Sequence, residues 1–419
     1  MNKLIIFLVQ GAILLLIDFH IDRAIIIASS SFSDFWKKFV RKGMWVISGL
    51  AIVSLMWYHF ADPFQAQVAF RQWIIIWVVI IYFSKIITVL FVLADDVRIG
   101  LLRLKRFFYK KKSAGELPGL PITRSKFLAQ TALVAGAAPF GTLVFGILSG
   151  ATDYQVFRKK IILPNLPKAF DGLRIGQLSD IHAGTFYSKV GVRGGVEMMM
   201  AEKADVLFFT GDLVNIQTSE VKDYITIFDK LKAPLGVFSV TGNHDYGNYR
   251  WWPDDASKQK NFDEMLEAHR LMGFDLLMNE HRFLEAGGDK LAIMGVENWG
   301  VGPSHRFPKY GKLNVAHAGT EDAAVKLLLS HDPSHWDAQI RPEFSDIDVT
   351  FAGHTHGFQM GVKIGDMRWS PAQYRFKQWA GLYQEANQYL YVNQGFGCIG
   401  YPGRIGMPPE LTIVELKRA

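Results

Sequence analysis

The sequence predicts two domains, an α-helical membrane domain over residues 1–150 and a layered α/β domain over residues 151–419. Apolar stretches that approach the ~20 residues of a spanning helix occur four times in the first domain. In the second domain, short apolar runs alternate with helix-length segments, which favours a buried sheet covered by helices. The charge also divides, because the first domain has 17 basic and 7 acidic side chains and the second has 29 and 32.

The overall composition excludes several classes of protein. With 49% hydrophobic and 13% aromatic residues, the 419-residue chain is not a disordered one. Its single cysteine, Cys398, excludes intrachain disulfides, a cysteine-rich zinc site and an iron–sulfur cluster. The net charge of +7 arises between the apolar stretches of the first domain. We therefore expect a membrane protein with no nucleic-acid partner.

Four membrane spans are predicted, and the loops between them differ in charge. Lys and Arg concentrate between spans one and two and between spans three and four, whereas only Arg71 lies between spans two and three. The positive-inside rule then places the two basic loops in the cytoplasm and both termini outside. We expect a multi-pass protein of the cytoplasmic membrane with its C-terminal domain facing the periplasm or exterior. The spans cover residues 4–19, 44–60, 73–94 and 128–149.

Two features of the membrane domain have alternative interpretations. Lys85 lies deep in the third span, where pairing with Asp18 or with a backbone carbonyl is expected in preference to a transport role. The basic segment Leu101–Phe108 is suited to contact with anionic membrane lipids, and a simple topology anchor explains it equally well.

In the α/β domain, polar side chains follow the predicted strands where each one ends. The strands are expected at residues 173–179, 205–210, 236–240, 290–295, 326–330 and 348–352. Ligands of α/β folds gather beyond the carboxyl ends of strands. The oxygen and nitrogen donors found there suit Mn, Fe, Co or Zn, and their number predicts two metals bridged by a shared carboxylate. These residues are Asp180, His182, Asp212, Asn243, His244, His331, His354 and His356.

The order of the motifs carries a family resemblance. They are Asp180-Ile181-His182, Gly211-Asp212, Gly242-Asn243-His244-Asp245, His331 and Gly353-His354-Thr355-His356. This set resembles the calcineurin-like metallophosphoesterase family over residues 170–419, and the N-terminal spans resemble its bacterial membrane-anchored branch. The resemblance implies a four-layer α/β/β/α sandwich with a dimetal site at the strand ends.

The resemblance also implies roles for single residues. Asp180, His182 and His356 would hold the first metal. Asn243, His331 and His354 would hold the second, with Asp212 bridging. His244 would assist at the phosphate without binding metal, and Asp245 would either orient His244 or cap the turn. Phe358 departs from the branch, where glycine is more frequent, and it would narrow the pocket or contact substrate.

The resemblance implies hydrolysis of a phosphate ester or pyrophosphate by in-line attack of a metal-bridging hydroxide, with two divalent ions (Mn, Fe or Zn, with Mn favoured). One alternative substrate is UDP-2,3-diacylglucosamine in lipid A synthesis, although that nucleotide sugar is cytoplasmic. A different class of function is a non-catalytic membrane receptor for a phospho-ligand. The intact ligand set argues against the receptor.

An aromatic-rich segment, residues 246–253, suggests a lipid-linked phosphate as substrate. Its large rings must pack somewhere, and the predicted helix over residues 257–272 is one place. Alternatively, Trp251 and Trp252 lie at the membrane interface while Arg250 reaches a phosphate.

Overall fold

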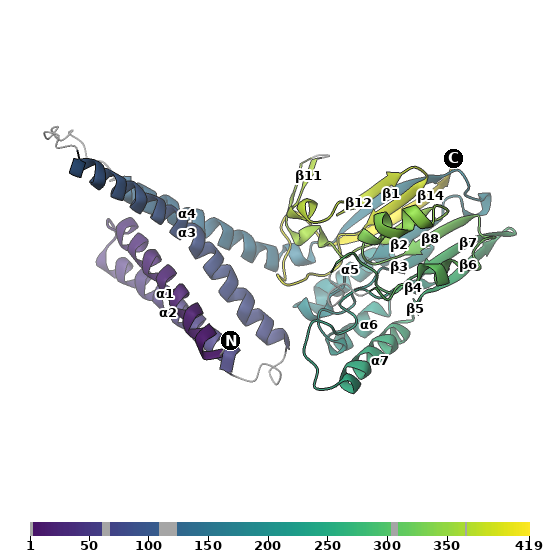
Figure 1. The fold of residues 1–419 in the computed structure, drawn as a ribbon, viewed down its shortest axis with the longest axis horizontal. Helices are drawn as coiled ribbons and strands as arrows, with labels where there is room; N and C mark the ends of the chain where they lie inside the picture. The colour runs from purple at the N-terminus through teal and green to yellow at the C-terminus, as the bar shows by residue number, and fades with distance from the viewer. Residues whose placement is uncertain (1–2, 61–67, 109–123, 303–308, 365–366) are drawn as a thin grey trace. The chain divides into compact units, whose positions relative to one another are not determined.

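The computed structural model describes residues 3–60, 68–108, 124–302, 309–364 and 367–419. The chain divides into two compact units, Met1–Val144 and Phe145–Ala419, which are described separately. Figure 1 shows long helices in the first unit and a layered sheet structure in the second.

The first unit consists of helices long and apolar enough to cross a membrane. Four such spans are found within the described residues, which confirms a multi-pass membrane protein. Lys110, Lys111 and Lys112 of the expected basic loop lie outside the described residues. The last turn of α4, from Phe145 onward, belongs to the second unit. The helices are α1 (Lys3–Ala28), α2 (Asp34–Phe60), α3 (Val68–Phe108) and α4 (Arg124–Leu148).

Lys85 pairs with Asp18 inside the first unit, as one of the two expected alternatives stated. Its Nζ lies 2.6 Å from Asp18 Oδ1 and 3.0 Å from Ser48 Oγ. The other Asp18 oxygen accepts a hydrogen bond of 2.8 Å from the Tyr82 hydroxyl. Both oxygens of the buried carboxylate are thereby satisfied, which a low-dielectric interior requires.

Two six-stranded mixed sheets form the centre of the second unit. Six of their strands are the predicted apolar runs, which confirms those runs as buried strands. The first sheet has the order β1 (Gln155–Leu163), β14 (Glu410–Arg418), β2 (Arg174–Leu178), β3 (Val206–Phe209), β4 (Val237–Ser239) and β5 (Asp275–Leu276). The second has the order β12 (Gly381–Glu385), β13 (Gln388–Val392), β9 (Val349–Ala352), β8 (Val325–Leu329), β7 (Asp289–Gly295) and β6 (Glu280–Ala286).

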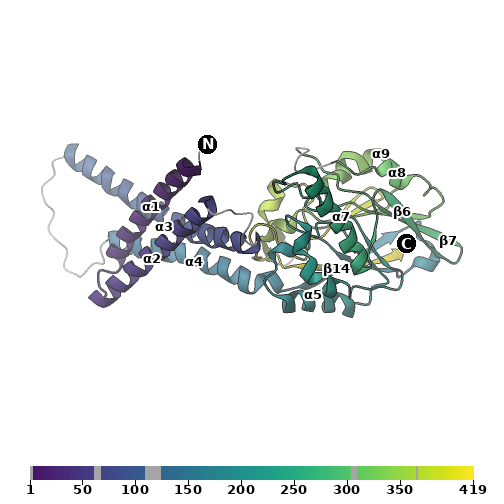
Figure 2. The ribbon, with the colours of Figure 1, turned by 90° about the horizontal axis from the view of Figure 1, so that it is seen from below.

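The two sheets pack face to face, and helices cover their outer faces. The inner core joins residues of both sheets, such as Phe208 of β3 and Phe351 of β9. The first sheet packs against α5 (Lys189–Ala201), α6 (Ile225–Phe228) and α7 (Asp255–Met272), which Figures 1 and 2 show gathered on one side. The second packs against α8 (Leu313–His317) and a π-helical turn at Trp336–Ile340 that leads into α9 (Arg341–Glu343). This is the expected four-layer sandwich.

Strand direction brings the polar segments together. Strands β2, β3 and β4 run parallel in the first sheet, and β7, β8 and β9 run parallel in the second. Their carboxyl ends therefore lie along common sheet edges. All four side chains of β3 and of β9 are buried, and the predicted metal ligands lie beyond the ends of the strands.

Candidate metal centre

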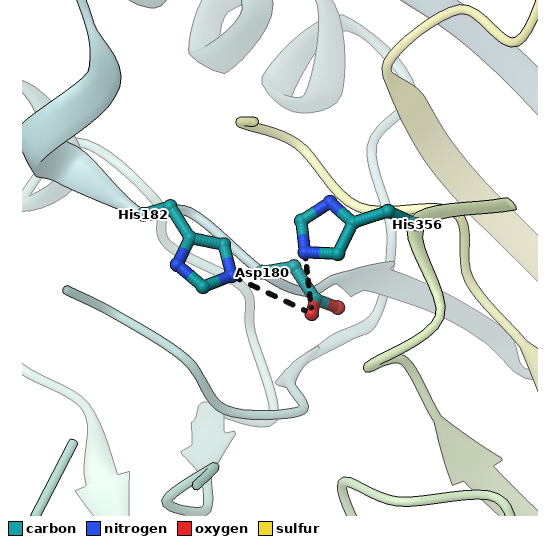
Figure 3. Close-up of side chains that lie close together, drawn as sticks. All are labelled: Asp180, His182 and His356. Carbon is teal, nitrogen blue, oxygen red and sulfur yellow. Dashed lines mark ion pairs between the residues drawn. The ribbon is translucent and has the colours of Figure 1, made fainter. Parts of the chain in front are cut away.

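A first group of potential metal ligands contains Asp180, His182 and His356, all buried. Figure 3 shows both imidazoles directed at one oxygen of Asp180. Their Nε2 atoms lie 3.9 Å (His182) and 3.2 Å (His356) from Asp180 Oδ1. Asp180 and His182 follow β2, whereas His356 follows β9, so the group joins the two sheets.

A second group contains Asp212, His331 and His354. The Nε2 atom of His331 lies 3.1 Å from Asp212 Oδ2 and 3.3 Å from His354 Nδ1. The same Asp212 oxygen lies 3.5 Å from His182 Nε2, in the first group. One carboxylate oxygen thus faces ligand atoms of both groups, which is the geometry that a bridging ligand needs.

Asn243 presents an amide oxygen that is buried and has no hydrogen-bond partner among the described residues. Its Nδ2 donates to the Tyr249 hydroxyl over 2.6 Å. This bond fixes which end of the amide is used, because it engages the nitrogen and leaves the oxygen available for a metal.

Backbone strain concentrates on these residues. Asp180, His182, Asp212, His354 and His356 all have φ between +45° and +71°, which side chains other than glycine rarely adopt. Gly353 packs so closely that a Cβ there would lie 2.1 Å from Asp180 Oδ2. Strained conformations of this kind are retained at functional sites, where the surrounding structure holds them.

Three of the donors, His182, His356 and Asp212, fit divalent metals in their ionisation as well as their geometry. Burial lowers the pKa of His182 and of His356, so both imidazoles are neutral at pH 7. Although burial opposes it, nearby histidines hold the pKa of Asp212 below its usual range. Neutral imidazoles and ionised carboxylates are the forms that bind metals. The buried Nε2 atoms of His182 and His356 have no hydrogen-bond partner among the described residues, as expected of metal ligands.

His244 lies beside the two groups with its ring held from both sides. Its Nδ1 contacts the backbone carbonyl of Asn215 at 2.6 Å. Because a carbonyl oxygen only accepts, Nδ1 carries the hydrogen and Nε2 remains available for a ligand. The ring stacks on Tyr249 at 4.0 Å and meets His182 edge-on at 4.9 Å.

The carboxylate of Asp245 binds backbone and does not contact the His244 ring through any described hydrogen bond. It accepts N–H groups from Gly242, Asp212, Leu213 and Val214 over 2.8–3.3 Å. Of the two expected roles, this geometry favours capping the turn, which fixes the segment that carries Asp212.

Three further residues support the centre; sequence patterns gave no indication of Arg404 and Glu220, and Tyr249 appeared only as one ring of the aromatic segment. Arg404 is buried, and its Nη2 donates to carbonyls of Gln394 and Gly395 and lies 3.4 Å from His356 Nδ1. Glu220 accepts the backbone N–H of Asn215 and so holds the carbonyl that binds His244. Burial raises the pKa of Glu220 to about 7, against the lowering effect of backbone N–H groups. Tyr249 contacts both Asn243 and His244.

The aromatic segment mostly packs within its own domain. Tyr246 stacks on Phe262 of α7 at 5.2 Å, and Trp252 donates to the Gly247 carbonyl over 2.7 Å. Arg250 stacks on Trp252 and donates to Gln217. Trp251 is 67% exposed.

Phe358 lies in the turn that follows His354 and His356. Its φ is +58°, a conformation that glycine adopts without strain, which explains why glycine suits this position. The side chain is 53% exposed and therefore available to an apolar part of a substrate.

Comparisons with known proteins agree with this geometry. Residues 173–358 match the family of calcineurin-like phosphoesterases, and residues 2–151 match a family described as the transmembrane domain of probable calcineurin-like phosphoesterases. A Danio rerio transmembrane protein with a metallophosphoesterase domain is 28% identical over 76% of this chain and 69% of its own length. An uncharacterized metallophosphoesterase of Bacillus subtilis is 28% identical over 66% of this chain and 94% of its own.

Among solved structures, a dimetal phosphatase from Danio rerio aligns with 54% of this chain and 88% of its own, at 12% identity and a TM-score of 0.32. That similarity is too distant to support a functional comparison. One family match covers the first unit, and the other covers residues 173–358 of the second. This protein is a membrane-associated metallophosphoesterase that carries a calcineurin-like phosphoesterase domain after a phosphoesterase transmembrane domain.

Proposed function

We propose that this metallophosphoesterase hydrolyses a lipid-linked phosphate ester or pyrophosphate at the surface of its own membrane. In this proposal residues 1–150 are the membrane domain and residues 151–419 the catalytic domain. The catalytic domain faces the periplasm or exterior of the cytoplasmic membrane, as the basic loops indicate.

The ligand assignment follows the two groups of side chains. Asp180, His182 and His356 would hold one ion. Asn243, His331 and His354 would hold the other, and Asp212 would serve both, because its Oδ2 faces both groups. When bound, two such ions would stabilise charge on the phosphoryl oxygens and activate the attacking water. Mn is the favoured metal for this mixed oxygen and nitrogen set, with Fe or Zn as alternatives.

Residues of the chain supply the remaining chemistry. His244 directs Nε2 toward the substrate, since Nδ1 is engaged by Asn215. Burial lowers the pKa of His244, so the free imidazole is neutral at pH 7, and an arriving phosphate dianion would favour its protonated form. The protonated ring then hydrogen-bonds a phosphate oxygen and delivers a proton to the leaving oxygen.

One observation supports a lipid-linked substrate above others. The backbone N–H of Arg404 donates to the Gly146 carbonyl, in the last turn of the spanning helix α4, over 3.0 Å. The guanidinium of the same residue lies 3.4 Å from His356 Nδ1. A single arginine therefore connects the end of a candidate spanning helix with a predicted metal ligand, and this link supports the proposal that the metal centre acts near lipid headgroups.

The test compares substrates that share one reacting group. The full-length protein in vesicles should hydrolyse a lipid-linked pyrophosphate with a kcat/KM at least about ten-fold above that for the water-soluble headgroup. UDP-2,3-diacylglucosamine belongs in the same series. Equal values for lipid-linked and soluble substrates would refute the lipid preference, and Asp212→Asn serves as the inactive control. A C-terminal reporter that is active only inside the cell would refute the orientation.

A further inference from the structure

A cavity of about 320 Å³ lies in the second unit, where α4 enters it; Arg404 lines it, but none of the predicted metal ligands does. Phe145, Ser149 and Gly150 form one wall, and these residues lie within the candidate span Lys126–Thr152. Lys363 and Arg368 form another wall. A cavity of this size is comparable with small-molecule binding sites, and part of its lining belongs to a candidate membrane span.

The two cations come from a short hairpin with two different faces. Strands β10 (Val362–Ile364) and β11 (Met367–Trp369) pair antiparallel and stand apart from the two sheets (Figure 1). Because side chains alternate along a strand, Lys363 and Arg368 share the face that lines the cavity. The opposite face is apolar and exposed, by 44–65%, at Val362, Ile364, Met367 and Trp369.

Lys363 and Arg368 lie directly opposite each other in the ladder. Like charges in that position destabilise a sheet. No carboxylate among the described residues forms an ion pair with either side chain. Asp153, the one acidic residue that lines the cavity, is exposed and accepts from Gln155. An anion between Lys363 and Arg368 would offset the repulsion between their positive charges.

We propose that this cavity binds the phosphate of an anionic membrane lipid, while the apolar face of the β10–β11 hairpin inserts among the acyl chains. The spanning helix that ends in the cavity wall brings the bilayer to this site. The exposed Phe145, Val362 and Ile364 suit acyl chains, and Lys363 and Arg368 suit the phosphate. The lipid bound here is a structural partner and need not be the substrate, so the site stands or falls independently of the proposed function.

The first test measures lipid binding without using activity. The full-length protein is purified with phosphatidylcholine and phosphatidylglycerol, and native mass spectrometry determines how much phosphatidylglycerol it retains. Lys363→Glu with Arg368→Glu should weaken retention at least ten-fold, because attraction becomes repulsion. Lys260→Glu with Lys312→Glu makes the same change in net charge at exposed positions of α7 and of the residue before α8, and it should bind like the wild type.

Equal loss in the two variants, or loss in neither, would overturn the proposal. Bound metal and the unfolding temperature show whether each variant is folded. If the charge reversal does not fold, Lys363→Gln with Arg368→Gln should still weaken retention, and wild-type retention by that variant would also overturn it.

The second test locates the hairpin. Cys398 is buried, so a fluorophore on Ile364→Cys is selective. In nanodiscs, lipids with brominated acyl chains should quench this label. They should not quench a label on Val315→Cys, a 50% exposed position on α8. Helix α8 packs on β6 and β7, at the edge of the second sheet opposite to β12. Equal quenching at both positions, or none at 364, would contradict insertion.

Discussion

Removing one hydroxyl, with Tyr249→Phe, should weaken the second metal site and leave the first intact. The hydroxyl accepts from Asn243 Nδ2 over 2.6 Å, whereas the ring stacks on His244 and is unchanged by the substitution. A buried amide N–H that loses its acceptor costs about 1–3 kcal/mol. The amide can also turn its nitrogen toward the metal, which removes a ligand. Loss of such a supporting contact lowers metal affinity by about 10–100-fold.

Equilibrium dialysis against Mn²⁺ separates the two binding steps and provides the assay. Tyr249→Phe should lower the weaker affinity by that factor and change the tighter one little, if the second ion is the weaker. Tyr389→Phe is the matched control, because its hydroxyl donates to Ile162 at the opposite end of the strand from the metal residues. Two unchanged steps, or an equal loss in both, would refute the role assigned to Tyr249.

Three other outcomes are expected. The pKa of Glu220 is about 7 in the folded state and 4.5 for the free side chain, so its contribution to stability is present at low pH and lost as the pH rises through 7. The unfolding free energy of Glu220→Gln should therefore rise by about 2 kcal/mol relative to that of the wild type between pH 5.5 and 8. Denaturant unfolding measures this difference, and a difference that does not vary with pH would contradict the prediction. Arg404→Met leaves buried carbonyls without donors, which should lower the unfolding free energy by about 3–5 kcal/mol. The same substitution should lower the affinity of the first metal ion. An unchanged metal titration would exclude a supporting role of Arg404 at His356. Burial opposes protonation of His331, but the charge of Asp212 outweighs burial and raises the pKa of His331 to about 10. Metal binding should therefore displace a proton, and metal affinity should increase roughly ten-fold per pH unit near neutrality. Calorimetry in buffers of different ionisation enthalpy measures this proton release, and its absence would contradict the prediction.

The predictable parts of this protein are those where local sequence and burial agree. Strands β3 and β9 are buried on both faces, so they appear as mostly apolar runs followed by polar ligands. The edge strand β1 alternates partly exposed and buried positions and contains Arg158, Lys159 and Lys160, so its composition resembles a surface segment. Its pairing with β14, at the other end of the domain, has no local signal.

The residues that support the metal centre could not be predicted from the sequence, for a related reason. Arg404 reaches His356 across 48 positions of sequence, and Tyr249 acts through a hydroxyl that the aromatic pattern does not distinguish. Contacts of this kind depend on how loops close in three dimensions. The ligands themselves were visible because their positions are fixed by strand ends.

Counting bound metal together with activity tests the central claim, a two-metal centre bridged by Asp212 and served by His244. The wild type should hold two ions per chain and hydrolyse a soluble aryl phosphate, which does not depend on the lipid proposal. Asp212→Asn should lose activity and metal at both sites, whereas His244→Ala should keep both ions and lose most activity, because it loses no metal ligand. Metal loss in His244→Ala as complete as that in Asp212→Asn, or activity that persists in Asp212→Asn, would contradict the account.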